Sequence, residues 1–260
     1  MYDVIIVGAG MAGMTAGIYV ARAGKKVLVL ESQAVGGQIL PAVTVENWPG
    51  DLGVSGADLM EKISHQMNKL GAEMKYAEVL VVETVSDSGD NKRQFVVKTD
   101  DGEYACSAII IATGTKPRKL SESQAADAGE RPISYCATCD GALYRGKSVV
   151  VVGSGNTAKH EIKYLEGICS KVYHIHHDDP IPKEAEAVFV ATKRVPATKA
   201  FADLVKLDED GYVVAGEDCV TSCSGVFVAG DCRTKSVRQL VTAAGDGAVA
   251  AGGVLEYLEK

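Results

Sequence analysis

Residues 2–32 read YDVIIVGAGMAGMTAGIYVARAGKKVLVLES, in which a short apolar strand, a glycine-rich turn, a helical pattern and a second apolar strand follow one another. Gly8, Gly10 and Gly13 form the turn. Glycines at this spacing allow a tight turn and bring the backbone close to a pyrophosphate at the helix N-terminus. Glu31 ends the second strand and is placed to accept hydrogen bonds from a ribose diol. Because strand, helix, strand and acid fall in order, a dinucleotide-binding βαβ unit is favoured over a purely structural glycine turn.

The same pattern occurs again in residues 147–177, KSVVVVGSGNTAKHEIKYLEGICSKVYHIHH. Gly153, Gly155 and Ala158 form its turn, and residues 171–175 form its second strand. The chain therefore carries two dinucleotide-type βαβ units, an internal duplication. Such a pair is typical of proteins with one site for a flavin and another for a nicotinamide.

Composition limits the remaining possibilities. The 260 residues suffice for one large core or two modest ones, and 47% hydrophobic residues with 28 glycines favour a compact α/β protein. A net charge of −7 argues against nucleic-acid binding. We expect no signal peptide, because Met1 leads directly into an apolar strand, and no membrane span, because the apolar runs are too short. Seven cysteines, an odd count, disfavour a fully paired secreted framework, so we expect a cytoplasmic protein with mostly reduced thiols.

Segments later in the chain extend the first unit. Two further apolar strands end in small or acidic residues: AIIIATGTKP (108–117) at Thr113 and Gly114, and GVFVAGD (225–231) at Gly230 and Asp231. Residues 238–258 predict a C-terminal helix whose N-terminus can face a ligand. Residues 93–114 alternate in polarity and predict a β-meander with a turn at Asp101 and Gly102. These signals support a flavin at the first βαβ unit.

A C-x-x-C pair lies in CATCDG, residues 136–141. Cys136 and Cys139, near a helix start, can close a small reducible disulfide whose thiolate is favoured by helix-end N–H groups. A zinc site completed by Cys219 and Cys223 is the competing interpretation, but CVTSC has looser spacing and precedes an ordinary core strand. Three more cysteines lie in or beside apolar strands and are expected to pack there: Cys106, Cys169 and Cys232.

Several separated motifs occur in the order of one known family: GAGMAGM, GGQ (36–38), ENWPG (46–50), ATG, CATCDG, GD and RQLVTAAGDGA. The chain resembles the low-molecular-weight thioredoxin reductases, which are FAD-dependent disulfide oxidoreductases. The resemblance covers nearly the whole chain. It implies an α/β fold with a doubly wound, Rossmann-like FAD-binding domain in a three-layer ββα arrangement. A second Rossmann-like βαβ domain interrupts this FAD-binding domain. It also implies a homodimer.

The resemblance assigns roles to residues. Cys139 would face the flavin, Cys136 would attack the disulfide of thioredoxin, and Asp140 would handle the thiol proton. Residues implied in FAD binding are Gly8, Gly10, Gly13, Glu31, Gly37, Gln38, Asn47, Thr113, Gly114, Gly230, Asp231, Arg238, Gln239 and Ala244. Their expected contacts are the pyrophosphate and ribose for Gly10, Gly13 and Glu31, the middle of the cofactor for Gln38 and Asn47, the ribityl or phosphate region for Asp231, and the isoalloxazine ring for Arg238, Gln239 and Ala244. A small residue at Ala244 is equally compatible with helix packing.

The stretch KVYHIHHDDPIPKEAEAVFVATK, residues 171–193, departs from the family pattern. Members that use NADPH end this strand in a histidine followed by basic residues, and the aligned residues here are His176, His177, Asp178 and Asp179. The two acidic side chains would repel a 2′-phosphate. Only DDPIPKEAE (178–186) stands where members have several further strands. We therefore predict a truncated second domain, with the chain divided into residues 1–116 (FAD-binding, first part), 117–187 (truncated domain with the C-x-x-C pair) and 188–260 (FAD-binding, second part).

The missing nucleotide motifs leave three hypotheses for function. Family members that resemble this chain in lacking these motifs take electrons from reduced ferredoxin, so we expect a ferredoxin-dependent flavin thioredoxin reductase. The first alternative is a reductase that uses NADPH or NADH, with Asp178 accepting a ribose diol. The second is a flavin-binding redox module without thioredoxin turnover, against which the C-x-x-C pair argues. We expect no metal, although His174, His176 and Asp178 would share one face of a continuing strand.

Overall fold

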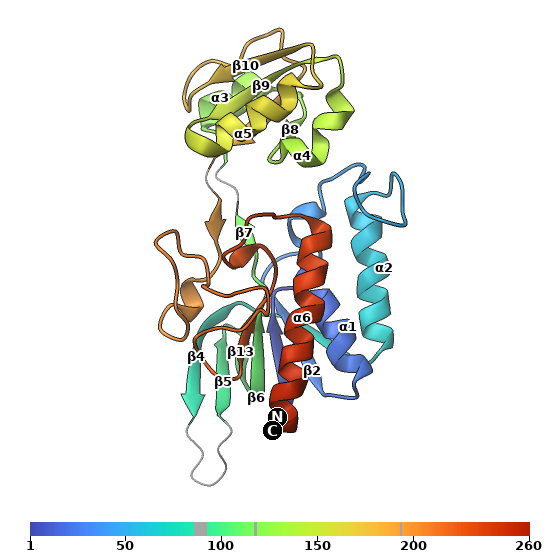
Figure 1. Ribbon diagram of the computed structural model, residues 1–260, viewed down its shortest axis with the longest axis vertical. Helices are drawn as coiled ribbons and strands as arrows, with labels where there is room; N and C mark the ends of the chain where they lie inside the picture. The colour runs from blue at the N-terminus through green and yellow to red at the C-terminus, as the bar shows by residue number, and fades with distance from the viewer. Residues whose placement is uncertain (86–92, 117–118, 193) are drawn as a thin grey trace. The chain divides into compact units, whose positions relative to one another are not determined.

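The computed structural model describes residues 1–85, 93–116, 119–192 and 194–260 (Figure 1). The chain divides into two compact units. Unit 1 contains residues 1–115 and 196–260, and unit 2 contains residues 116–195. The return to unit 1 therefore lies after residue 195, and the boundary at 187/188 expected from the sequence is wrong. The apolar strand after residue 186 belongs to unit 2 because it pairs with strands of that unit.

Unit 1 is built on a sheet in the order β3-β2-β1-β6-β5-β4, with β13 also paired to β6. Its parallel strands are β1 (Tyr2–Val7), β2 (Val27–Glu31), β3 (Glu73–Tyr76), β6 (Gly102–Ile111) and β13 (Val226–Val228). The antiparallel strands β4 (Val79–Val85) and β5 (Gln94–Thr99) form the predicted meander with the first half of β6. The long β6 thus joins the meander to the parallel strands.

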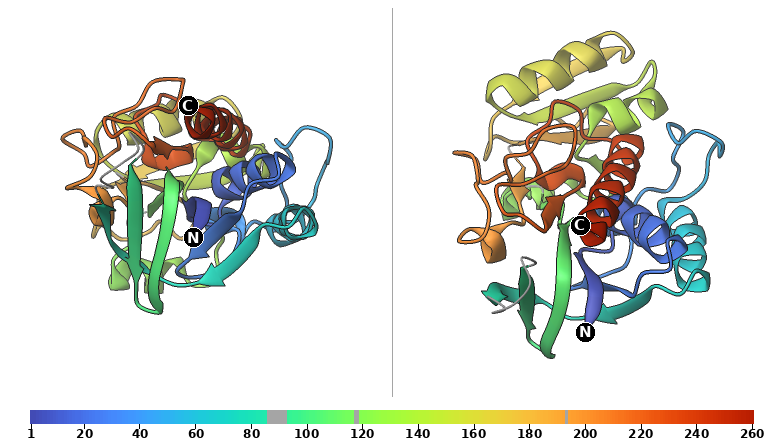
Figure 2. Two further views of the ribbon diagram at one scale, coloured as in Figure 1. Left: turned by 90° about the horizontal axis from the view of Figure 1, so that it is seen from below. Right: turned by 60° about the horizontal axis from the view of Figure 1, so that its bottom comes forward.

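Three helices cover one face of this sheet: α1 (Met11–Arg22), α2 (Gly56–Lys69) and α6 (Leu240–Glu259), as Figure 2 shows. Successive residues of β1 point to opposite faces. Val4 and Ile6 are buried in the cluster that includes these helices, and Ile5 and Val7 are buried in a second cluster on the other face. A strand buried on both faces explains the unbroken apolar run VIIV.

Unit 2 is a parallel four-stranded sheet in the order β10-β9-β11-β8. Its elements are α3 (Glu122–Ala128), β8 (Ile133–Ser134), α4 (Ala137–Asp140), β9 (Ser148–Gly153), α5 (Gly155–Glu166), β10 (Lys171–Ile175) and β11 (Ala187–Ala191). All five residues of β11 are buried between β9 and β8. Residues 176–186 connect β10 directly to β11, with no strand between them. The α/β, Rossmann-like fold expected from the sequence is confirmed in both units.

Short elements complete the chain. They are η1 (Gly37–Ile39), η2 (Gly141–Tyr144), η3 (Lys199–Phe201), η4 (Gly230–Cys232) and the strands β7 (Thr115–Lys116) and β12 (Val195–Pro196), which pair where the chain passes between the units. Within the residues that the structure describes, no helix is both long and apolar enough to cross a membrane.

Candidate functional site

The predicted nucleotide residues of unit 1 converge at one edge of its sheet. The register pairs Val7 with both Leu30 and Ile111, and Ile111 with Val228, so the four parallel strands end level with one another. Immediately beyond these ends follow Gly8, Gly10, Glu31, Thr113, Gly114, Gly230 and Asp231. Strand β1 has β2, the next strand in the sequence, on one side and β6 on the other, so the strand order reverses at β1. Open α/β sheets bind ligands at such a switch point.

The three glycines of the first turn have different constraints. A Cβ on Gly13 would lie 1.8 Å from the carbonyl oxygen of Gly8, and a Cβ on Gly8 would lie 2.4 Å from the carbonyl oxygen of Ala112. A Cβ on Gly10, in contrast, would meet no atom within 4 Å. Gly10 is also the N-cap of α1, and no side chain caps that helix end. Gly8 and Gly13 are therefore required for packing, whereas Gly10 leaves open space at a helix N-terminus where a pyrophosphate can approach.

Glu31 holds this turn in place. Its carboxylate accepts hydrogen bonds from the N–H of Ala9 (2.8 Å) and from the N–H of Gln33 (2.9 Å). The N–H of Gly36 donates to the carbonyl of Ala9 at 2.8 Å, and an added Cβ on Gly37 would lie 3.7 Å from the Cα of Gly10. The start of η1 thus lies beside the glycine turn. This proximity is needed if Gly10 and Gly37 are to contact the same cofactor, as the sequence predicts.

Three further predicted segments of unit 1 make hydrogen bonds to residues distant in the sequence. The side-chain amide of Gln38 donates to the hydroxyl of Thr115 at 3.1 Å, and that of Asn47 donates to Gln239 Oε1 at 3.1 Å. Gly114 has a φ of +65°, and its carbonyl accepts the N–H of Ala197. Sequence motifs far apart in the chain are thereby joined.

Arg238 organises the loop before α6. Its guanidinium donates to the backbone carbonyls of Asp231, Arg233 and Lys235 at 3.0–3.2 Å and lies 4.3 Å from the ring centroid of Tyr212. These contacts hold the loop that follows Gly230, independently of any contact with a flavin. Ala244 is half-buried against the core cluster beneath α6, so its observed role is helix packing.

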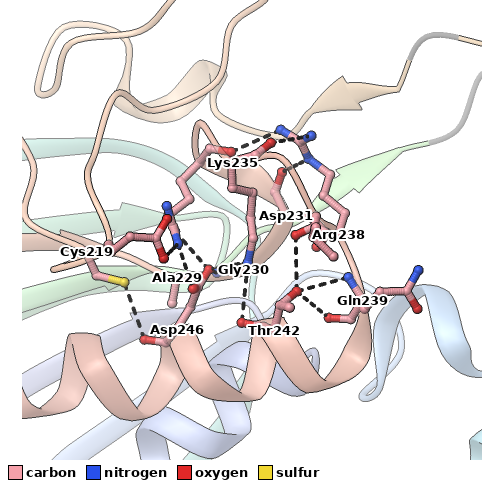
Figure 3. Close-up of polar contacts among 12 residues, drawn as sticks. Cys219, Ala229, Gly230, Asp231, Lys235, Arg238, Gln239, Thr242 and Asp246 are labelled. Atoms are coloured by element: carbon pink, nitrogen blue, oxygen red, sulfur yellow. Dashed lines mark hydrogen bonds and ion pairs between the residues drawn. The ribbon is translucent and has the colours of Figure 1, made fainter. Parts of the chain in front are cut away.

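An ion cluster that the sequence motifs did not predict lies behind Gly230 (Figure 3). Asp246 Oδ2 accepts hydrogen bonds from the N–H of Gly230 (2.9 Å), from Arg233 Nε (2.9 Å) and from Lys235 Nζ (2.7 Å), while Oδ1 accepts one from Arg233 Nη2 (2.9 Å). Arg233 is only 1% exposed and Asp246 only 7%. The cluster ties α6 to η4, so it fixes the turn that contains Gly230 and Asp231.

The charges in this cluster stabilise one another. Burial alone would raise the pKa of Asp246, but the hydrogen bonds from Arg233 and Lys235 outweigh it and lower that pKa. The hydrogen bond to Asp246 raises the pKa of Arg233 above its usual range. An acid inside the otherwise apolar helical stretch LVTAAGDGAVAA was the sequence signal that could have revealed this cluster.

In unit 2, Cys136 and Cys139 form a disulfide. Cys136 is the N-cap of α4, and its carbonyl accepts the N–H groups of Cys139 and Asp140, both at 3.1 Å. Both cysteines are partly accessible. In unit 1, by contrast, Cys219 and Cys223 are buried free thiols.

Two residues near this disulfide were not predicted. Ser134, at the end of β8, donates to Asp140 Oδ2 at 2.6 Å. Glu161, on α5, has a buried Oε2 with no hydrogen-bond partner in the described part of the chain. Burial raises the pKa of Glu161, the N–H of Ala137 and the charge of Arg194 oppose this, and Asp140 adds to it. No local sequence pattern indicates that Ser134 contacts Asp140 or that Glu161 lies near Ala137, because the fold of unit 2 brings these elements together.

The end of β10 is occupied by contacts within the protein. The fully buried Gln124 on α3 donates to the carbonyls of His176 and Asp179, both at 3.0 Å, and its Oε1 lies 3.1 Å from His177 Nδ1. The N–H of His176 donates to Asp179 Oδ2 at 2.8 Å. Asp178 has a φ of 78° in this turn, so it does not continue the strand face that a metal site with His174 would need.

Comparison with known proteins identifies the family. The family model described as pyridine nucleotide-disulphide oxidoreductase matches residues 2–184 and 181–247. A thioredoxin reductase of Bacillus subtilis (strain 168) is 34% identical, covering 100% of this chain and 96% of that protein. The structure of a thioredoxin reductase from Streptococcus pyogenes MGAS5005 has a TM-score of 0.90 at 32% identity, covering 100% and 98% of the two chains. A ferredoxin-flavin thioredoxin reductase from Clostridium acetobutylicum has a TM-score of 0.63 at 27% identity, covering 99% and 97%.

The fold and site therefore define a two-unit Rossmann-like disulfide oxidoreductase. The chain belongs to the pyridine nucleotide-disulphide oxidoreductase family. Its cofactor is FAD. The open space at Gly10, the uncapped start of α1 and the nearby Glu31 carboxylate fit the pyrophosphate and ribose of that cofactor.

Proposed function

We propose that this chain is a thioredoxin reductase that receives its electrons from reduced ferredoxin. The observation that carries the proposal is the end of the second βαβ unit. There Gln124 contacts His176 and His177, and the acidic residues Asp178 and Asp179 follow where binding of a 2′-phosphate needs basic side chains, while the chain keeps the Cys136–Cys139 disulfide and the open space at Gly10.

The register supports the loss of nicotinamide binding. In unit 1, Leu30 pairs with Val7 and Glu31 follows as the ribose acid. In unit 2, Ile175 pairs with Val152, so the equivalent position is His176, which has no carboxylate for a ribose diol. Asp178 and Asp179 follow, and their charges repel a 2′-phosphate. The retained Gly153 turn favours the nicotinamide alternative, which is the second candidate.

FAD binding in this proposal uses the edge of unit 1. Backbone N–H groups at Gly10 and the start of α1 hold the pyrophosphate, and Glu31 accepts the ribose diol, because a carboxylate has lone pairs beyond the two that its backbone contacts occupy. Asp231 would bind the ribityl or phosphate region of FAD, and Gln239 at the start of α6 would contact the isoalloxazine. When bound, FAD accepts single electrons and delivers them in pairs.

The dithiol then carries the pair to thioredoxin. Two reduced ferredoxins supply two electrons and the solvent supplies two protons, which convert the Cys136–Cys139 disulfide into two thiols. Cys136 gives its proton to Asp140, its thiolate forms a new S–S bond with one sulfur of oxidised thioredoxin, and the other thioredoxin sulfur leaves and takes up a proton. Cys139 then loses its proton, and its thiolate attacks Cys136 Sγ of the mixed disulfide and displaces the bound thioredoxin sulfur, which takes up a proton. The Cys136–Cys139 bond is restored and dithiol thioredoxin is released.

The comparisons support this proposal in two ways. Relatives that match the whole chain are thioredoxin reductases, and one similar structure is a ferredoxin-flavin thioredoxin reductase. We extend the proposal to a homodimer, as the resemblance implies.

Anaerobic reduction of the purified flavoprotein separates the electron donors. NADPH, NADH and reduced ferredoxin are each added while the visible flavin absorbance is followed, and thioredoxin reduction is measured in parallel. We expect bleaching and turnover with ferredoxin alone; rapid bleaching by either nucleotide would establish the nicotinamide alternative instead.

Cysteine variants test the path to thioredoxin. Cys136→Ser and Cys139→Ser should each keep FAD and lose thioredoxin reduction. Cys169→Ser is the matched control, because Cys169 is a free, half-buried thiol of unit 2 outside the motif. Flavin reduction by ferredoxin without thioredoxin reduction in the unmodified protein would favour a redox module without turnover.

A further inference from the structure

Ser134 is buried next to the redox pair. It is the last residue of β8 and is only 6% exposed. β8 is held by β11, with Ser134 paired to Phe189. The hydroxyl is therefore presented from the end of a short edge strand that pairs with the buried strand β11, two residues before Cys136.

The Ser134 hydroxyl joins the two ends of the redox segment. It donates to Asp140 Oδ2 at 2.6 Å and accepts the N–H of Cys136 at 3.1 Å. Its distance to the carbonyl of Cys136 is longer, 3.4 Å. One side chain thus contacts both the first residue of the C-x-x-C pair and the acid that follows the pair.

The intervening residue is held as well. Arg194 Nη2 donates to the carbonyl of Tyr135 at 2.8 Å. Tyr135 lies between Ser134 and Cys136, so each residue of the segment 134–136 makes a hydrogen bond within unit 2. A hydrogen bond from a preorganised donor orients a catalytic carboxylate better than a mobile water does.

A hydroxyl suits this position in both protonation states of Asp140. It has one proton to donate and two lone pairs. The Cys136 N–H occupies one lone pair, so the proton is available to the Asp140 carboxylate. When Asp140 carries a proton, the second lone pair can accept it without movement of the backbone.

We propose that Ser134 is a positioning residue that holds the Asp140 carboxyl at the start of the Cys136–Cys139 segment, so that Asp140 exchanges a proton with the dithiol. This inference rests on the proposed function only in its use of Asp140 as the proton-handling group. A serine that merely capped the turn would need the Cys136 contact alone, whereas this hydroxyl also donates to Asp140.

A double-mutant cycle tests the inference. Ser134→Ala, Asp140→Asn and the double variant are prepared in a Cys169→Ser background, which removes the half-buried free thiol of unit 2. Each holoenzyme is reduced with dithiothreitol, desalted and mixed with the aromatic disulfide 5,5′-dithiobis(2-nitrobenzoate), and the rate of the fast thiol phase is measured. Ser170→Ala, an exposed serine of the same unit, is the matched control.

We expect Ser134→Ala to slow the exchange about tenfold when Asp140 is present and less than twofold in the Asp140→Asn background. Ser134→Thr, which keeps the hydroxyl, should restore most of the rate. Equal slowing in both backgrounds would show that Ser134 acts through the fold and not through Asp140, and would overturn the inference; so would an unchanged rate for Ser134→Ala.

The same variants distinguish this inference from the proposed function. Thioredoxin reduction is assayed with each protein after chemical reduction. If the cycle shows coupling while thioredoxin stays oxidised, the positioning role stands and the proposed substrate is wrong. If the Ser134→Ala variant and the protein that keeps Ser134 reduce thioredoxin at equal rates, the positioning role is wrong and the proposed substrate stands.

Discussion

Arg233 and Asp246 form a buried two-pronged ion pair in which Arg233 Nε and Nη2 each lie 2.9 Å from a different oxygen of the Asp246 carboxylate. The same carboxylate accepts the N–H of Gly230. The pair therefore connects the interior of α6 to the turn that contains Gly230 and Asp231, so a change in the pair acts on that turn.

Asp246→Asn should destabilise unit 1 by about 3–5 kcal/mol, because it removes the buried counter-charge of both Arg233 and Lys235. Urea unfolding followed by circular dichroism measures the loss, and flavin fluorescence measures release of FAD. Glu217→Gln is the matched control, because Glu217 also contacts Arg233 but its side chain is 93% exposed. Comparable destabilisation by both changes would contradict this account.

The contribution of Asp246 to stability should depend on pH. Because its pKa in the folded protein is lowered, the carboxylate stabilises the fold above the unfolded-state pKa of about 4 and this stabilisation is lost as the pH falls through the lower, folded-state value. The difference in unfolding free energy between the unmodified protein and Asp246→Asn should therefore be constant near neutral pH and shrink in acid. A difference that grows in acid would show that the sign is wrong.

Glycine substitutions should separate FAD binding from folding. Gly10→Ala adds a methyl group to open space, so the apoprotein should keep its stability within about 1 kcal/mol while FAD affinity falls at least about tenfold. Gly13→Ala places a Cβ against the carbonyl of Gly8 and should destabilise the apoprotein itself. Thermal unfolding without FAD and fluorescence titration with FAD provide the two measurements. Full FAD affinity in Gly10→Ala would argue against the pyrophosphate position.

Glu161→Gln should stabilise unit 2 at pH values above the raised pKa of Glu161 and have little effect in acid. Burial raises the pKa of Glu161 in the folded protein. Below the unfolded-state pKa of about 4, Glu161 is neutral in both the folded and the unfolded protein, so it has no effect on stability. Above the folded-state pKa it is ionised in both, and the buried charge then destabilises the folded protein by its full amount. Thermal unfolding across this pH range measures the effect. Glu166→Gln, an exposed change on the same helix, is the control and should show no such trend.

Thiol reactivity should distinguish the redox pair from the packing cysteines. Burial raises the pKa of both Cys106 and Cys219 to about 12, which leaves almost no thiolate near neutral pH. After reduction, iodoacetamide should modify Cys136 and Cys139 and leave Cys106 and Cys219 unmodified until the protein is unfolded. Mass spectrometry of the peptides identifies the sites, and rapid native modification of Cys106 would contradict its burial.

Local patterns predicted much of the architecture. The strands at residues 4–7 and 171–175, the C-terminal helix and the turn at Asp101 and Gly102 all lie where the sequence places them. Each is encoded by residues close together in the chain, so periodicity and turn chemistry suffice. The position of β11 was mispredicted because an apolar run of five residues fits any buried parallel strand and carries no information about its neighbours.

The sequence by itself determined that two βαβ units and one C-x-x-C pair exist, because glycine spacing and cysteine spacing are properties of short segments. Tertiary structure alone decided that Asp246 lies behind Gly230, that Ser134 contacts Asp140 and that Gln124 closes the turn after β10. These contacts join residues whose proximity depends on strand order and helix packing. Their geometry follows from the burial of whole faces of the sheets, which no single segment encodes.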